Sequence, residues 1–107
     1  MDQHQLQEER SIAYHRALAE KIDADPSLLE QVQSRLSLWH GEGKIHPRYA
    51  EAWRQLLESP LAELRRRLID PGEEMRALRQ CTPFVGILTP QERWTIWREV
   101  REQLVEP

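Results

Sequence analysis

The sequence of 107 residues has one cysteine, one phenylalanine, four glycines and no long apolar run. The single cysteine, Cys81, cannot form an internal disulfide, which fits a reducing compartment. No apolar stretch approaches the roughly 20 residues that span a bilayer, and no segment has the shape of a signal peptide. We therefore expect a cytoplasmic protein that does not associate with a membrane.

An excess of charge of one sign is also lacking. The chain has 15 Lys and Arg against 18 Asp and Glu, a formal net charge of −3. This balance creates no overall field toward nucleic acid or anionic lipid, so any nucleic-acid contact needs a local basic patch. A chain of this length can bury roughly two-thirds of the surface that it exposes when unfolded. We expect one domain over residues 1–107, with frayed ends at residues 1–5 and 105–107.

Apolar residues recur at helical spacing, and no stretch shows the strict alternation of an exposed strand. The pattern predicts an all-α fold, a compact single-domain bundle of five to six short helices. The predicted helices are 7–22, 26–40, 47–58, a segment between Pro60 and Pro71, 71–80 and 90–104. In the last of these the apolar stripe expected to be buried is Trp94, Trp97, Val100 and Leu104.

Four helix starts are marked by a capping residue followed directly by proline. Proline fits the first helical position because its missing N–H would be unpaired there, and the preceding side chain accepts from the first-turn amides. The pairs are Asp25-Pro26, Ser59-Pro60, Asp70-Pro71 and Thr89-Pro90. Glu92 follows Thr89 at capping-box spacing, which makes this the best-defined boundary in the chain.

The segment Pro83–Leu88 is apolar, although its sequence marks it as a connection between two helices. Proline after Thr82 ends the preceding helix, and Gly86 permits a tight bend. An apolar connection either packs into the bundle as a plug or lies exposed as a docking surface for another protein. The sequence leaves both alternatives open.

Residues that could carry catalysis or bind a metal do not converge in the sequence. The four histidines do not pair at metal-ligand spacing, and neither a glycine-rich phosphate loop nor a nucleophile elbow occurs. Cys81 follows a predicted helix C-terminus, which disfavours a thiolate. We therefore expect no enzyme activity, no metal site and no cofactor.

Two arginine-rich regions are candidate binding surfaces. In the last helix arginines interleave with tryptophans, the residue types typical of interaction hot spots. The predicted partner-binding residues are Phe84, Val85, Ile87, Arg93, Trp94, Trp97, Arg98 and Arg101. The second region is a nucleic-acid patch made of Arg65, Arg66, Arg67, Arg76 and Arg79, although nearby glutamates are available as partners for these arginines.

Four segments carry a resemblance to a known family: SIAYHRALAEKI, DPSLLEQV, YAEAWRQLLESPLAEL and RALRQCTPFVGILTPQERWTIWREVRE. Over residues 11–103 the chain resembles small all-helical bacterial hypothetical proteins. Some of these look like the neutralising, antitoxin-like partner of two-gene toxin–antitoxin modules. The sharpest part of the resemblance is Thr82–Arg98. It implies a protein that acts by binding and has no catalytic signature.

Taken together, these observations predict a non-catalytic protein-interaction module. Its expected role is that of an antitoxin-like protein or inhibitor that binds and blocks another protein, such as a toxin or an effector enzyme. An exposed apolar patch would also favour a homodimer. The alternative function is a nucleic-acid-binding regulator that uses the second arginine region.

Overall fold

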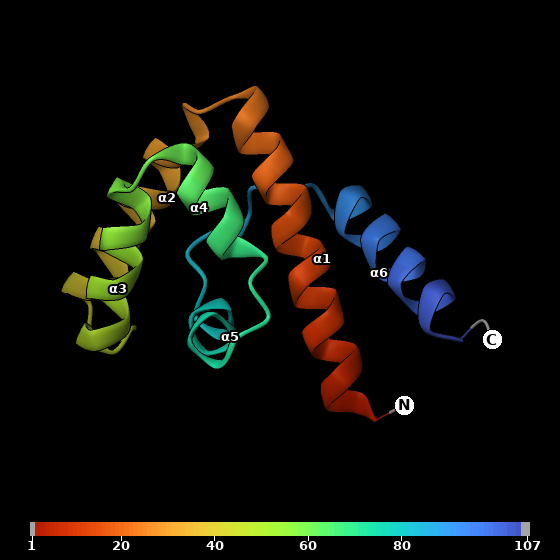
Figure 1. Cartoon of the computed structure of the whole chain (residues 1–107). Helices are drawn as coiled ribbons and strands as arrows, with labels where there is room; N and C mark the ends of the chain where they lie inside the picture. Colours follow the sequence, from red (N-terminus) through yellow and green to blue (C-terminus); the bar gives the residue numbers. More distant parts are fainter. Residues whose placement is uncertain (1, 106–107) are drawn as a thin grey trace.

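The computed structural model describes residues 2–105, which form six α-helices and no strand (Figure 1). The helices are α1 (Gln3–Ala24), α2 (Leu28–Gly41), α3 (Pro47–Glu58), α4 (Leu61–Leu68), α5 (Glu73–Gln80) and α6 (Pro90–Val105). The predicted all-α fold is confirmed. None of these helices is both long enough and apolar enough to cross a membrane.

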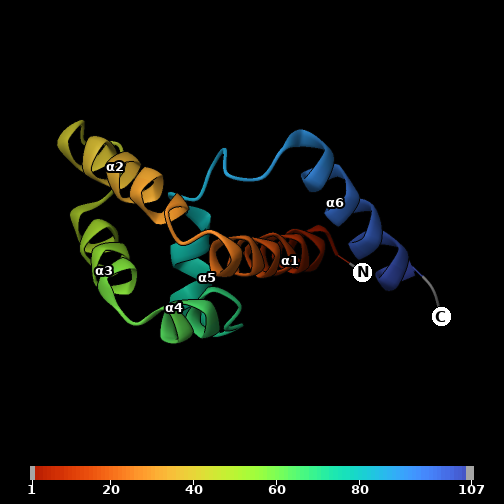
Figure 2. The ribbon, with the colours of Figure 1, turned by 90° about the horizontal axis from the view of Figure 1, so that it is seen from above.

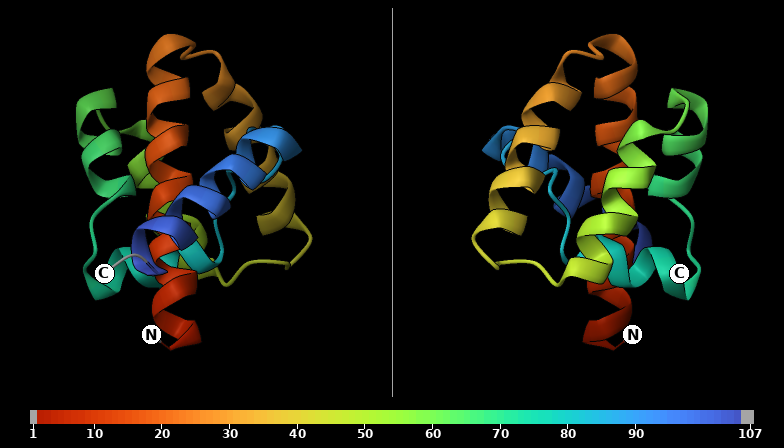
Figure 3. Two further views of the ribbon diagram at one scale, coloured as in Figure 1. Left: turned by 90° about the vertical axis from the view of Figure 1, so that its right-hand side faces the viewer. Right: turned by 90° about the vertical axis from the view of Figure 1, so that its left-hand side faces the viewer.

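The central helix is α1, which lies between α4 on one side and α6 on the other (Figures 1 and 2). On the α4 side, α3 contacts α2, α4 and α5, and α5 also contacts α4. The main helical neighbour of α6 is α1, which α6 crosses obliquely (Figure 3). One face of α6 is therefore covered by α1, and its opposite face is left for solvent or a partner.

The start of α6 has the predicted capping box. Glu92 Oε1 accepts a hydrogen bond from the Thr89 backbone N–H at 2.8 Å, and the Glu92 backbone N–H donates to Thr89 Oγ1 at 3.1 Å. Lys21 on α1 donates to the same Glu92 oxygen at 2.9 Å. The cap therefore also ties α6 to α1.

Three other predicted starts are displaced by one or two residues. The helices α2, α4 and α5 begin after the predicted prolines, at Leu28, Leu61 and Glu73. Before α5, the Asp70 carboxylate accepts from the Gly72 backbone N–H at 2.7 Å and so closes a turn ahead of the helix. A polar side chain before proline can stabilise a turn as well as a helix end, which explains the displacement.

The first helix is longer than its predicted range of 7–22. The Asp2 carboxylate accepts a hydrogen bond from the Gln5 backbone N–H at 2.7 Å, so α1 begins at Gln3. Residues 3–5, for which we expected fraying, form the first turn. The fraying expected for residues 1, 106 and 107 lies outside the described residues.

The core is built by apolar side chains from five helices and from the connection between α5 and α6. The helical contribution includes Leu18, Ile22, Val32, Leu36, Trp53, Leu57, Leu64, Leu68, Met75 and Leu78. Phe84 from the connection is fully buried, with 0 % of its surface exposed, and its ring centroid lies 5.8 Å from that of Trp53. Ile87 and Leu88 belong to the same buried cluster. The Pro83–Leu88 connection is therefore a plug in the core.

Side chains from α1 and α2 bind the carbonyl oxygens of this plug. Tyr14 Oη donates to the Phe84 carbonyl at 3.0 Å, Arg35 to the Pro83 carbonyl at 3.1 Å and Lys21 to the Ile87 carbonyl at 2.9 Å. A buried connection is costly because its peptide groups lose water, and these bonds replace that water. The positive φ of 81° at Gly86 allows the tight bend.

The burial of the plug corrects part of the predicted binding surface. Phe84 and Ile87 were predicted to contact a partner, and in this fold both are buried against the helices. Of the predicted residues in the connection, only Val85 is exposed.

Replacement of Phe84 tests the plug. We expect Phe84→Ala to lower the free energy of unfolding by about 3–5 kcal/mol, because a buried ring is lost and a cavity remains. Val85→Ala, the neighbouring exposed position, should change the free energy of unfolding by less than about 0.5–1 kcal/mol. Urea unfolding followed by circular dichroism measures both. Equal stability of the two variants would contradict the plug.

Candidate interaction surface

The tryptophans of α6 lie at the surface. Ile96 and Val100, four residues apart, face α1, whereas Trp94 is 63 % exposed and Trp97 is 44 % exposed. The predicted buried stripe, which placed both tryptophans beside Val100, is therefore wrong. Residues two positions apart on a helix differ in direction by about 200°, so a seam through Ile96 turns Trp94 outward.

Arginines accompany the tryptophans on this outward side. Trp94, Trp97, Arg98 and Arg101 follow the spacing of one helical face, and Arg93 lies at its edge. We call these five residues the tryptophan face of α6. All five are exposed, and within residues 2–105 none of the three arginines forms an ion pair. The face therefore combines two large aromatic rings with three positive charges that have no ion-pair partner in the described part of the chain.

The arginines of the alternative nucleic-acid patch differ from these in their ion pairing, because each one lies near a carboxylate. The pairs are Arg65–Asp23 (3.3 Å), Arg66–Glu63 (2.6 Å), Arg67–Glu74 (3.4 Å), Arg76–Glu8 (3.4 Å) and Arg79–Glu8 (2.7 Å). Exposed ion pairs contribute little to stability, but these four carboxylates offset most of the positive charge of the five arginines. The basic run thus presents little net charge to a phosphate backbone.

Arg79 in particular is a structural residue. It is 3 % exposed, and its guanidinium donates to the carbonyl oxygens of Leu68 and Asp70 and to Glu8. It therefore joins α1 to the connection between α4 and α5. Its prediction as a phosphate contact is wrong in this fold, because its buried guanidinium is held by two carbonyl oxygens and by Glu8.

A groove of about 450 Å³ runs between α1, the start of the plug and α6. Its walls include Arg10, Tyr14, His15, Val85, Arg93 and Trp97. The Arg10 guanidinium lies over the Trp97 ring, 5.4 Å from its centroid, in cation–π geometry. Among the described residues, no aspartate or glutamate lines this groove. We call it the α1–α6 groove.

His15 lies at the inner wall of the α1–α6 groove and is buried. Its Nδ1 lies 2.7 Å from the Ser11 carbonyl and must donate to it, so Nε2 accepts from Thr82 Oγ1 at 3.0 Å. Thr82 Oγ1 in turn accepts from the Phe84 backbone N–H at 3.2 Å. Burial lowers the pKa of His15 to about 4, so the ring is neutral at pH 7. The chain of bonds holds the entry to the plug.

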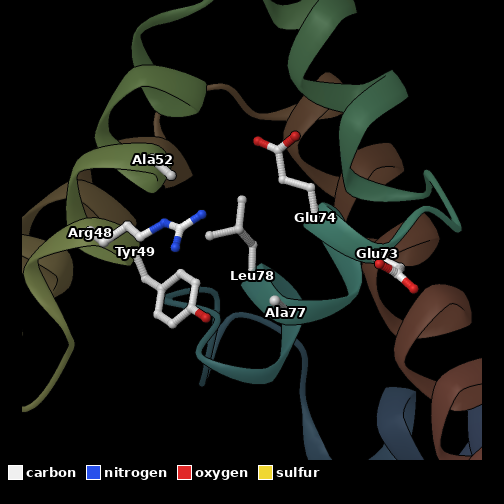
Figure 4. A pocket seen from close by; sticks show the side chains of 7 residues that line it. All are labelled: Arg48, Tyr49, Ala52, Glu73, Glu74, Ala77 and Leu78. Atoms are coloured by element: carbon white, nitrogen blue, oxygen red, sulfur yellow. The ribbon is translucent and has the colours of Figure 1, made fainter.

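A second hollow, of about 380 Å³, lies between α3 and α5 (Figure 4). Arg48 extends from α3 over Leu78, and Glu74 projects toward the same space from α5, while Glu73 points away (Figure 4). Glu74 is paired with Arg67 at 3.4 Å. The opposite charges nearly cancel, and no nucleophile lies beside a general base here.

Metal ligands and known relatives give no further guidance to function. Among residues 2–105, no three His, Cys, Asp or Glu side chains gather as a metal site would require. The thiol of Cys81 is partly buried, and this burial raises its pKa, which disfavours a reactive thiolate. Comparison with protein-family models, curated proteins and solved structures found no match.

Arg10 and Tyr14 are among the residues of the α1–α6 groove that sequence reasoning did not select as binding residues. Both lie on α1, far from the Arg/Trp-rich segment in the sequence, and neither stands in a motif. Only the packing of α1 against α6 brings Arg10 to Trp97. No local pattern could have predicted this contact.

The buried neutral state of His15 predicts a pH dependence of stability. The pKa of about 4 in the folded protein lies below the ordinary value of 6.5, so the unfolded chain binds more protons between these values. We expect the free energy of unfolding to fall as pH falls from 6.5 to 4, by up to about 3 kcal/mol. Urea unfolding at a series of pH values, with an NMR titration of His15, measures this.

His15→Gln is the control for this titration. It keeps a polar side chain but removes the ionisable ring, so the loss of stability between pH 6.5 and 4 should largely disappear. Glu92 does not confuse the result. Its pKa is lowered by the hydrogen bond from the Thr89 backbone N–H and then by Lys21, so its stabilisation begins to be lost as pH falls through the ordinary value of 4.5, but equally in the wild type and in His15→Gln. An unchanged pH slope in His15→Gln would contradict the assignment.

Proposed function

We propose that the protein is a non-catalytic interaction module that binds another protein through the tryptophan face of α6. The observation that carries this proposal is the exposure of Trp94 and Trp97 beside three arginines without acidic partners in the described residues. Large exposed aromatic side chains are costly in water unless they serve a contact. Tryptophan and arginine are also the residue types that contribute most to binding energy in interfaces.

The contacts that hold α6 in place favour a binding surface that is formed before the partner binds. Its first turn is fixed by the capping box and by the Lys21–Glu92 ion pair, and its inner face packs on α1 through Val100. The Arg10 guanidinium lies over the Trp97 ring. A surface that is ordered before binding loses less conformational entropy in the complex, which favours affinity.

Binding through such a face is sufficient for inhibition. A protein that occupies a functional surface of a toxin or an effector enzyme blocks it by exclusion and needs no chemistry of its own. The resemblance of residues 11–103 to small all-helical bacterial proteins, some of which look antitoxin-like, is consistent with the same role. We therefore propose an antitoxin-like or inhibitory function, with another protein as the partner.

The tryptophan face is preferred to the alternative nucleic-acid patch because of their charges. All five arginines of that patch face carboxylates, and Arg79 is buried. The affinity of proteins for duplex DNA comes largely from phosphates that free lysines and arginines neutralise. The three arginines of the tryptophan face, in contrast, form no ion pair within residues 2–105.

Substitutions in the tryptophan face test the proposed function. The immobilised protein is used to capture its partner from a lysate of its native cell, and mass spectrometry identifies the partner. We expect Trp94→Ala and Arg98→Ala each to weaken binding of the purified partner by at least about tenfold, as truncation of an interface hot spot does. Calorimetry measures the affinity, and thermal unfolding should shift little because both side chains are exposed.

The chain offers matched controls for both substitutions. Leu38 on α2 is 59 % exposed, close to the exposure of Trp94, and Arg48 on α3 is exposed like Arg98. Leu38→Ala and Arg48→Ala should leave partner affinity unchanged. Equal losses in the controls would contradict the proposed surface. Binding of a DNA duplex at low salt that is lost in Arg66→Glu would favour the nucleic-acid alternative.

A further inference from the structure

We propose that the α1–α6 groove receives a carboxylate side chain from an acidic segment of the partner, with an apolar side chain of the same segment beside it. This inference rests on the proposed function and specifies the chemistry of its partner. The groove adjoins the tryptophan face because Arg93 and Trp97 belong to both. A segment lying along α6 can therefore reach into it.

Arginines from α1, α5 and α6 line the groove, and Arg79 of α5 is already bound to Glu8. Arg10 comes from α1 and Arg93 from α6, and within residues 2–105 neither is paired with a carboxylate. The Arg10 Nε is buried and has no hydrogen-bond partner among the described residues, while the guanidinium lies over the Trp97 ring. A guanidinium fixed in this way presents its N–H groups as a planar fork, the geometry that binds a carboxylate with two hydrogen bonds.

Nothing that lines the groove neutralises this charge. Glu8 on α1 is already bound by Arg76 and Arg79, and Glu9, which precedes Arg10, is exposed and does not line the groove. His15 is neutral at pH 7 because burial lowers its pKa to about 4, so it neither adds nor removes charge. Burial raises the pKa of Tyr14, and the positive charge of Arg93 opposes this rise. The charge of Arg93 is therefore felt inside the groove.

The apolar part of the groove determines which partner side chain fits beside the carboxylate. Val85 and Trp97 are both exposed, and both line the groove. An aliphatic or aromatic side chain next to the acidic residue would cover them and remove their apolar surface from water. The chemistry of the groove therefore fits an acidic residue that neighbours a large apolar residue.

A second copy of the chain fits the surface less well. Two tryptophan faces packed on each other would bring Arg93, Arg98 and Arg101 of one copy toward those of the other. Like charges in an interface oppose association. A segment with carboxylates provides the complementary charge instead.

Defined peptides test the inference without knowledge of the natural partner. The probe is a short acetylated peptide that alternates glutamate with leucine and phenylalanine, and its matched control has glutamine in place of every glutamate. NMR titration of the full chain follows the indole N–H of Trp97 and the Nε–H of Arg93. We expect saturable shifts with the glutamate peptide, binding at least about tenfold weaker with the glutamine peptide, and weakening with added salt.

Variants assign the binding to the groove. Arg93→Glu should weaken binding of the glutamate peptide by at least tenfold. Arg10→Gln, which removes the charge but keeps a polar side chain, should weaken this binding as well. Arg48→Glu, an equal change of charge on α3, should have little effect. A peptide with lysine in place of glutamate should bind Arg93→Glu better than it binds the wild type. Thermal unfolding confirms that each variant is folded.

The outcomes separate this inference from the proposed function. Any one of three results would overturn the inference of an acidic segment: equal binding of the two peptides, equal effects of Arg93→Glu and Arg48→Glu, or no shift at millimolar peptide. This holds even if Trp94→Ala still abolished partner capture. Conversely, peptide binding lost in Arg93→Glu supports the groove even if Trp94→Ala leaves capture of the natural partner intact. A dimer could also be detected by sedimentation equilibrium. If Arg93→Glu stabilised this dimer and the peptide dissociated it, the occupant of the groove would be a second copy of the chain and not a partner segment.

Discussion

The fold depends on the burial of the Pro83–Leu88 plug with its backbone carbonyls bound by side chains. Phe84 fills the centre of the core against Trp53, and Tyr14, Arg35 and Lys21 replace the water that the peptide groups lose. These bonds come from α1 and α2, so the plug fixes both helices relative to the entry of α6. The position of the tryptophan face follows from this one buried connection.

Much of the fold was predictable because its signals are local. Helical periodicity and the Thr89 capping box gave the helices and the start of α6, since both depend on residues within a few positions of each other. The fate of the plug was not predictable, because the groups that satisfy its carbonyls lie on α1 and α2. The register of α6 was predicted wrongly, since the large tryptophans suggested a buried stripe whereas Ile96 and Val100 form the seam.

The candidate surface also has a part that could be predicted from local sequence and a part that depends on tertiary contacts. The interleaving of arginine with tryptophan was visible in the sequence, but the exposure of those side chains was not. For the arginines of α4 and α5, Glu63 and Glu74 could be recognised as partners, whereas Asp23 and Glu8 come from α1 and were not. The tertiary arrangement determines which arginines have a carboxylate partner and which do not. This difference decides between the two candidate surfaces.

The placement of α6 outside the main core has a dynamic consequence. Its principal neighbour is α1, and the buried cluster around Phe84 and Trp53 is assembled without a fully buried side chain from α6. The free energy needed to detach such a helix locally is smaller than that of global unfolding, so its amides should exchange with solvent by local opening. A bound partner would therefore protect α6 against exchange while the interior, already closed, shows little change.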